Sequence, residues 1–245
     1  MIAQPVLPKQ DFKIAFLNTI LGEFGSQPLR VLDLGCGTAK DWPSILRAHP
    51  SVTWTGVEPD TRSRETARKL LNGFPATVIA GWGEVVNTEG GFDLTLSLSV
   101  LEHVKYLDSF LRAGVAATRS GGVIVHRYDL GHALYPASLY ERALVTVSRR
   151  VPWLVPASRF TTHLEPARVV SALVAFGVSD VRVTHAQMYS LKQAMNYVSR
   201  IDGGEDLAGR LIALDAEVAT TLQPILAEAQ IAHLFPSVVV RGIKR

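Results

Sequence analysis

A short glycine-rich segment, VLDLGCGTAK at residues 31–40, restricts the possible folds of this chain more than any other feature. An apolar run leads into Asp33, two glycines follow at Gly35 and Gly37, and a helical pattern begins after Lys40. Glycine lets the backbone turn tightly and approach a ligand, and a helix N-terminus presents unpaired N–H groups. The segment therefore predicts a strand, a ligand-binding turn and a helix.

The next predicted strand, residues 52–58, ends in an acidic residue at a position that suits a nucleoside ligand. Glu58 follows Gly37 by 21 residues. An acidic residue about 20 positions beyond the glycines can accept hydrogen bonds from both ribose hydroxyls. A dinucleotide site would carry a third small residue where Lys40 stands, so the pattern disfavours a pyrophosphate ligand.

The segments DLGCGTA and GVEPD resemble the first two motifs of class I S-adenosylmethionine-dependent methyltransferases. The resemblance covers residues 29–129 and implies S-adenosylmethionine as cofactor, with the glycine turn against its methionine part and Glu58 on its ribose. It also implies that the cofactor meets loops after the third and fourth strands. The expected cofactor-binding residues are Asp33, Gly35, Cys36, Gly37, Glu58, Pro59, Trp82, Gly83, Ser97 and Leu98.

Strands and helices alternate along most of the chain. Further strands are expected at 76–80, 92–99, 123–130, 178–186 and 235–243. This order predicts an α/β protein with a doubly wound, mostly parallel, Rossmann-like sheet of seven strands. The resemblance implies that the last strand is antiparallel. A helical stripe that begins at Leu107 is expected to continue to Gly121 and Gly122.

Two helical segments interrupt the alternation within what we expect to be a single domain over residues 1–245. Residues 133–163 form an amphipathic insert, for which three interpretations stay open: a helix packed on the domain, a cap or lid over the substrate, or a membrane-surface contact. Residues 187–230 are a helical addition before the last strand, expected to extend the cap or a dimer interface.

Polar residues cluster where the fourth and fifth strands end, on the side that faces the ligand in a doubly wound sheet. They are His103, His126, Asp129 and His132. A neutral histidine can take the proton of a hydroxyl as it is methylated, so His126 is the favoured base, with Asp129 orienting it, and His103 is the alternative. Each histidine also has a purely structural interpretation. These residues and Glu102 match no metal-binding spacing, so no metal is predicted.

Composition limits the partners. The 245-residue chain is 47% hydrophobic with a formal net charge of +3, and its cations form no basic stripe with interleaved aromatic residues, so no nucleic acid is expected. No apolar run approaches the length of about 18 residues that spans a bilayer, so the sequence disfavours a membrane partner. A single cysteine and an N-terminus unlike a signal peptide favour a cytoplasmic location.

The favoured activity is O-methylation of a small-molecule acceptor, namely a metabolite, sugar or natural product. Two alternatives stay open. One is a noncatalytic partner protein that binds S-adenosylmethionine, and the other is a nucleic-acid methyltransferase, although the segment SLSVLEH lacks the tetrad typical of enzymes that methylate base amino groups. A homodimer is a further possibility.

Overall fold

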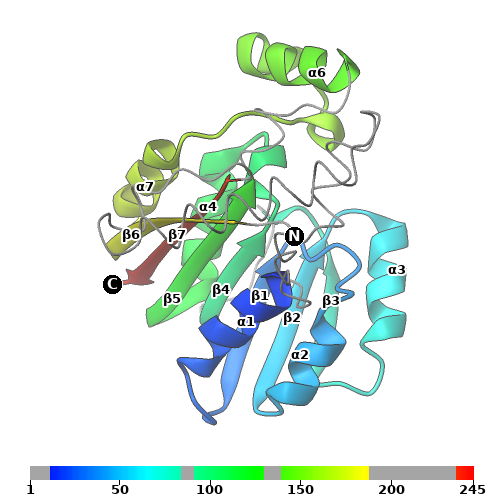
Figure 1. The fold of residues 1–245 in the computed structure, drawn as a ribbon, viewed down its shortest axis with the longest axis vertical. Helices are drawn as coiled ribbons and strands as arrows, with labels where there is room; N and C mark the ends of the chain where they lie inside the picture. Colours follow the sequence, from blue (N-terminus) through cyan, green and yellow to red (C-terminus); the bar gives the residue numbers. More distant parts are fainter. Residues whose placement is uncertain (1–11, 84–90, 130–138, 188–235) are drawn as a thin grey trace, which may run out of the picture.

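The computed structural model describes residues 12–83, 91–129, 139–187 and 236–245, and these form a seven-stranded sheet (Figure 1). The strand order is β3-β2-β1-β4-β5-β7-β6. β7 is antiparallel to β5 and β6, and the other neighbouring pairs are parallel, which confirms the predicted topology. The strands are β1 (Leu29–Leu34), β2 (Val52–Glu58), β3 (Ala76–Ala80), β4 (Phe92–Leu98), β5 (Thr118–Asp129), β6 (Val178–Gln187) and β7 (Pro236–Lys244).

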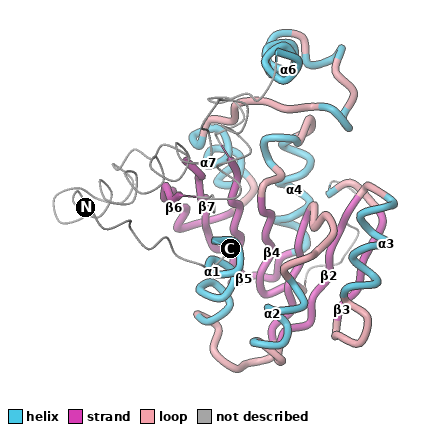
Figure 2. Tube along the Cα trace, turned by 45° about the vertical axis from the view of Figure 1, so that its right-hand side comes forward, coloured by secondary structure: helices cyan, strands magenta, loops and turns pink. Residues whose placement is uncertain are grey.

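Helices cover both faces of this sheet, and Figure 2 shows them in cyan around the magenta strands. Neighbouring residues of β1 point to opposite faces, so Val31 joins an apolar cluster under α1 and α2, while Leu32 joins a second cluster under α4 and α7. Burial on both faces explains why β1 reads as a nearly continuous apolar run. The helices are α1 (Phe12–Gly22), α2 (Trp42–Ala48), α3 (Thr61–Leu70), α4 (Leu107–Ala117), α6 (Leu139–Arg150) and α7 (Pro166–Ala175), with 3-10 turns η2 (Leu101–His103), η3 (Pro152–Leu154) and η4 (Ala157–Arg159).

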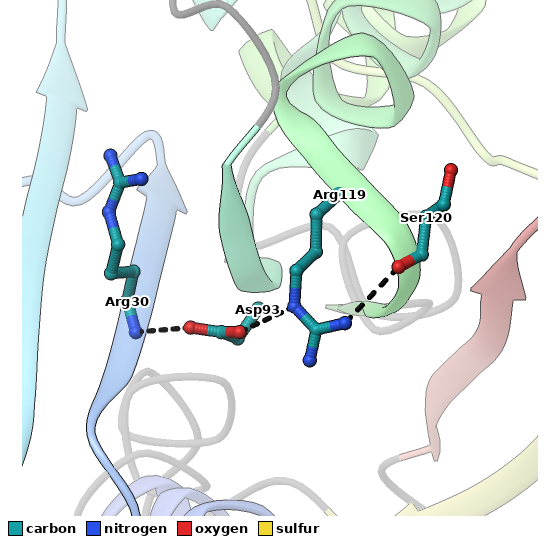
Figure 3. Close-up of polar contacts among 4 residues, drawn as sticks. All are labelled: Arg30, Asp93, Arg119 and Ser120. Carbon is teal, nitrogen blue, oxygen red and sulfur yellow. Dashed lines mark hydrogen bonds and ion pairs between the residues drawn. The ribbon is translucent and has the colours of Figure 1, made fainter.

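Asp93 joins three strands near the amino ends of β1 and β4 (Figure 3). Its Oδ2 accepts a hydrogen bond of 2.7 Å from the Arg30 backbone N–H, and its Oδ1 accepts one of 2.6 Å from Arg119 Nε. Arg119 also donates to the Ser120 carbonyl at 3.1 Å. These contacts lie at the edge of the sheet opposite the carboxyl ends of β1 and β4, so they tie the strands together away from the expected ligand side.

The boundary between α4 and β5 differs from the sequence-based expectation. α4 ends at Ala117, β5 begins at Thr118, and Gly121 and Gly122 therefore lie within the strand instead of ending the helix. Thr118 Oγ1 lies 2.8 Å from the Gly114 carbonyl oxygen and 2.7 Å from Thr95 Oγ1, which holds the start of the strand against β4. Gly121 has φ of 75°, a conformation that favours glycine, beside a register shift between β4 and β5.

Part of the segment predicted as a lid is described. Residues 139–163 contain α6, η3 and η4, and Figure 1 shows α6 standing apart from the sheet. His132, residues 133–138, and most of the helical addition at 187–230 lie outside the described residues. Among the described helices, none is long and apolar enough to cross a membrane.

Candidate active site

The glycine turn after β1 separates two cavities, and Gly35 lines both of them. Gly35 has φ of 78°, and a Cβ atom at this position would lie 2.7 Å from Val100 Cγ2. A larger residue is therefore excluded by both backbone conformation and space. The amides of Gly35 and Cys36 donate to the Val57 carbonyl oxygen at 2.8 and 3.1 Å, which fixes the turn to the end of β2.

Glu58 connects the end of β2 to the same turn. Its Oε2 accepts a hydrogen bond of 2.9 Å from the Gly37 amide, and its Oε1 accepts one of 2.9 Å from the Asp60 amide. The side chain is only 9% exposed and lines the first cavity. Two backbone donors therefore orient a nearly buried carboxylate toward the cavity. The sequence pattern predicted a ligand-binding carboxylate here but not its bond to the turn.

The first cavity has a volume of about 370 Å³ and lies beyond the carboxyl ends of β1 and β4. Pro59, Trp82 and Gly83, which are among the cofactor-binding residues expected from the sequence, line this cavity, and Trp82 is 45% exposed. A Cβ atom at Gly83 would collide with the Phe110 ring, so this glycine allows the loop after β3 to pack against α4. A largely apolar cavity with one carboxylate suits a nucleoside.

The second cavity, about 270 Å³, is more strongly charged. Asp33 lines it and accepts a hydrogen bond of 2.7 Å from Trp42 Nε1. Burial raises the pKa of Asp33 to about 7, although the Trp42 hydrogen bond acts in the opposite direction. Lys13 of α1 and Lys40 line the same cavity, and burial lowers the pKa of Lys13. Acidic and basic groups together suit the part of a ligand that carries both an ammonium and a carboxylate. The sequence alone did not identify Lys13 or Lys40 as residues of the site.

Cys36 packs within the turn. A Cβ atom at Gly56 would lie 2.6 Å from Cys36 Sγ, so the thiol fills the space over β2 that glycine leaves. Burial raises the pKa of the thiol, which makes the reactive thiolate form unfavourable. These contacts agree with the expectation that backbone packing, and not reactivity, explains the cysteine.

His103 of η2 is exposed and lines the first cavity together with a third, adjoining cavity of about 690 Å³. Its Nδ1 lies 3.0 Å from Thr161 Oγ1. Leu144 of α6 and residues 157–161 form the far wall of the third cavity, and Trp82 is shared by both cavities. His103 therefore stands where the nucleoside-sized space opens into a larger one.

Residues 155–162, which we name the arm, rest on the η2 turn through three polar contacts. Lys105 Nζ donates to the Val155 carbonyl oxygen at 2.7 Å, and the Thr162 amide donates to the Glu102 carbonyl oxygen at 2.9 Å. The third is the contact between His103 and Thr161. The arm is thus a wall of the site that is attached directly beside the candidate base.

His126 occupies a different position from the one that the sequence favoured. Its ring is fully buried, and its Nδ1 lies 2.8 Å from Ser97 Oγ. Burial lowers the pKa of His126 to about 4. The ring lies 6.4 Å from that of Phe110 and lines none of the three cavities. This placement separates His126 from the three cavities. Ser97 is likewise an interior residue, whereas Leu98 lines the second cavity.

Asp129 ends β5, and its side chain, like all of His132, is outside the described part of the chain. Within the described residues, no three His, Cys, Asp or Glu side chains are grouped as ligands of a metal ion.

Comparison with known proteins gives a family for this site. The family described as Methyltransferase domain matches residues 10–193. The ubiquinone biosynthesis O-methyltransferase of Rhizobium rhizogenes is 25% identical over 182 residues, covering 71% of this chain and 69% of that protein. The ajmaline N-methyltransferase of Rauvolfia serpentina is 25% identical over 154 residues, covering 58% of this chain and 53% of that protein.

Solved structures share the fold at low sequence identity. The phosphoethanolamine N-methyltransferase 2 of Haemonchus contortus, in complex with phosphomonomethylethanolamine and S-adenosylhomocysteine, has a TM-score of 0.63 at 16% identity, covering 98% of this chain and 54% of that one. A cyclopropane synthase of Mycobacterium tuberculosis has a TM-score of 0.62 at 15% identity, covering 98% and 87%. The chain spans about half the length of the ajmaline and phosphoethanolamine enzymes. With the family match over most of its length, the chain belongs to the class I S-adenosylmethionine-dependent methyltransferases.

Proposed function

We propose that this chain transfers the methyl group of S-adenosylmethionine to a hydroxyl of a small molecule, and that His103 takes the hydroxyl proton. The observation that carries the proposal is the position of His103, where the first cavity opens into the third. The ubiquinone biosynthesis enzymes among the relatives are named as O-methyltransferases, which supports a hydroxyl acceptor.

The residues around the first two cavities fit the cofactor. Glu58 would accept hydrogen bonds from the ribose hydroxyls, since its carboxylate lines the first cavity in a fixed orientation. Gly35 would permit close approach of the backbone where the two cavities meet. Asp33 and Lys13 would face the ammonium and carboxylate of the methionine part, because charged groups of both signs line the second cavity. When bound, the cofactor supplies a methyl group on a positively charged sulfur, which is already electrophilic.

The remaining work falls to the acceptor site. As the new C–O bond forms, the C–S bond breaks with its electron pair going to sulfur, and the acceptor oxygen must lose its proton. We assign that proton to His103 Nε2, because the contact of Nδ1 with Thr161 Oγ1 holds the ring in one orientation. The arm and the apolar side chains of Val100 and Phe110 would exclude water and align the acceptor.

The test is a comparison of His103→Gln with wild type in a transfer assay that uses radiolabelled cofactor and a panel of phenols, alcohols, carboxylic acids and amines. Turnover of hydroxyl acceptors should fall about 100-fold, the usual scale of general-base catalysis, while the cofactor dissociation constant stays unchanged. His163→Gln is the matched control, because this histidine also lies near the arm but lines none of the described cavities. Near-normal turnover in His103→Gln, or methylation of amines alone, would refute the proposal.

A further inference from the structure

The segment that leads from α6 into the arm carries an exposed apolar surface. Trp153 is 72% exposed, Leu154 is 69% exposed and Val147 is 38% exposed. Single exposed apolar side chains are ordinary on a protein surface, but two large ones next to each other, as Trp153 and Leu154 are, are typical of an interaction site. We name the set formed by Arg149, Arg150, Trp153 and Leu154, which follow one another closely at the end of α6 and in η3, the tryptophan patch.

The charges of this segment all have one sign. Residues 143–164 contain Arg149, Arg150 and Arg159 and no aspartate or glutamate. Arg149 and Arg150 are exposed, and within the described part of the chain neither has an ion-pair partner. The exposed Arg168, by contrast, pairs with Asp108. The tryptophan patch therefore combines exposed apolar side chains with uncompensated positive charge.

We propose that the tryptophan patch docks on the surface of an anionic lipid bilayer. Indole and leucine side chains enter the boundary between head groups and acyl chains, and nearby arginines are attracted to anionic head groups. The positive sign of the segment selects an anionic surface. No membrane-crossing helix is needed, because the contact is confined to the interface.

Docking at this place has a consequence for the acceptor, in so far as the proposed function holds. The third cavity is lined by Leu144 of α6, the helix that also carries Arg149 and Arg150, and by Ala157 of η4. The bilayer would then lie beside the wall of the acceptor site, so the acceptor class would be amphiphilic molecules with a hydroxyl-bearing head group. The apolar residues Val100 and Phe110 in the adjoining cavity suit such an acceptor.

A second copy of the chain is a poorer occupant. In a twofold dimer the same patch meets itself, so Arg149 and Arg150 of both copies would approach one another. Like charges brought together at an interface oppose association. Stable interfaces also bury about 800 Å² on each partner, more than these few side chains provide.

Co-sedimentation with vesicles tests the proposal on the full chain. One set of vesicles contains phosphatidylcholine alone, and the other contains equal parts of phosphatidylcholine and phosphatidylglycerol. Wild type should bind the second set more tightly, and raised salt should weaken that binding. The double variant Arg149→Gln/Arg150→Gln should lose about five-fold in partition for each arginine. Trp153→Ser/Leu154→Ser should lose about ten-fold or more on anionic vesicles, because its apolar contact is removed.

Matched controls separate the patch from general surface effects. Arg62→Gln/Lys69→Gln removes the same charge from exposed positions of α3, and Val174→Ser removes an apolar side chain that is 56% exposed on α7. Both should bind anionic vesicles like wild type. The cofactor dissociation constant, measured without lipid, should be unchanged in every variant, which verifies folding and keeps this test independent of methyl transfer.

Three results would overturn the proposal. The first is equal binding of the wild type to the two sets of vesicles. The second is binding of the patch variants to anionic vesicles that is as tight as that of the wild type. The third is a dimer of the wild type in sedimentation velocity that becomes a monomer in Trp153→Ser/Leu154→Ser. Such a result would assign the tryptophan patch to contact with a second copy of the chain.

Discussion

The Gly37 amide donates a hydrogen bond of 2.9 Å to Glu58 Oε2, so the carboxylate at the end of β2 holds the glycine turn at the end of β1. The two residues are 21 positions apart, and Gly37 follows β1 while Glu58 ends the neighbouring parallel strand β2. Glu58 also accepts from the Asp60 amide, directly before α3. The Glu58 side chain thus connects the glycine turn, β2 and the start of α3. The proposed contact with the ribose would be made by a carboxylate that these hydrogen bonds already hold in place.

Replacing Glu58 with alanine should weaken binding of S-adenosylmethionine about ten-fold or more, because hydrogen bonds to a charged group contribute roughly 1.5 to 3 kcal/mol each. Glu58→Gln should lose less, since its amide oxygen can still accept from Gly37. Titration calorimetry measures both constants. Glu65→Ala, an exposed change on α3, is the control. Equal affinity in wild type and Glu58→Ala would remove Glu58 from the cofactor site.

His126 should make the fold sensitive to acid. Burial lowers its pKa from 6.5 to about 4, so the unfolded chain binds a proton at a pH where the folded chain does not. The free energy of unfolding should therefore fall as the pH drops from about 6.5 to about 4, and this residue should account for roughly 2 to 3 kcal/mol of the loss at pH 4.5. Urea unfolding at neutral and acidic pH measures the change.

His126→Asn isolates this contribution, because its side-chain amide can occupy the position of Nδ1 beside Ser97. The variant should lose less stability than wild type over the same pH interval. An identical pH dependence in both proteins would show that His126 is not held neutral. Turnover serves as a second measurement, and it should change far less in His126→Asn than in His103→Gln if the base is His103.

The sequence predicted the frame of the site because the relevant signals are local. The predicted bounds of β2 and β3 follow from short runs that end at Glu58 and before Gly81, and these bounds are confirmed. The predicted strand before the glycine turn is also confirmed, since β1 ends directly before Gly35. The carboxyl ends of parallel strands meet at one edge, so the positions of Glu58, Trp82 and His103 beside the cavities also follow from strand order.

The orientation of His126 could not be predicted in the same way. Whether a strand residue faces a cavity or the core depends on its pairing with the neighbouring strand, and β4 and β5 shift register between Phe92 and Leu94. The shift accompanies glycines that the sequence pattern assigned to the end of a helix. The polar run at the end of β5 therefore gave no indication that the His126 ring would be buried in contact with Ser97, 29 residues earlier.

Cofactor affinity should depend on pH through Asp33. Burial raises the pKa of Asp33 to about 7, so below this pH the carboxyl is largely neutral in the free protein. The ammonium of the methionine part would favour the ionised form of Asp33, so the affinity for the cofactor should rise between pH 6 and pH 8. The rise should be about ten-fold if the cofactor binds only the ionised form, and binding near neutral pH should release a proton. Calorimetry in buffers of different ionisation enthalpy measures both quantities. Asp33→Asn should remove the wild-type pH dependence and proton release that come from this group, and a proton count unchanged by this substitution would assign the second cavity a different role.

The attachment of the arm should control how often the acceptor site opens. Lys105 Nζ donates to the Val155 carbonyl oxygen at 2.7 Å, two residues after the highly exposed Trp153. Lys105→Met keeps the aliphatic stem and removes the donor, so opening should become about ten-fold more frequent, as expected for loss of a charged hydrogen bond. Chymotrypsin cleavage after Trp153 reports this opening, and Lys69→Met on α3 is the matched control.

If the arm is also a moving lid, S-adenosylmethionine together with an acceptor should slow the cleavage of wild type. Cleavage at the same rate in wild type and Lys105→Met would mean that the other contacts, between His103 and Thr161 and between Thr162 and Glu102, are sufficient to hold the arm in place.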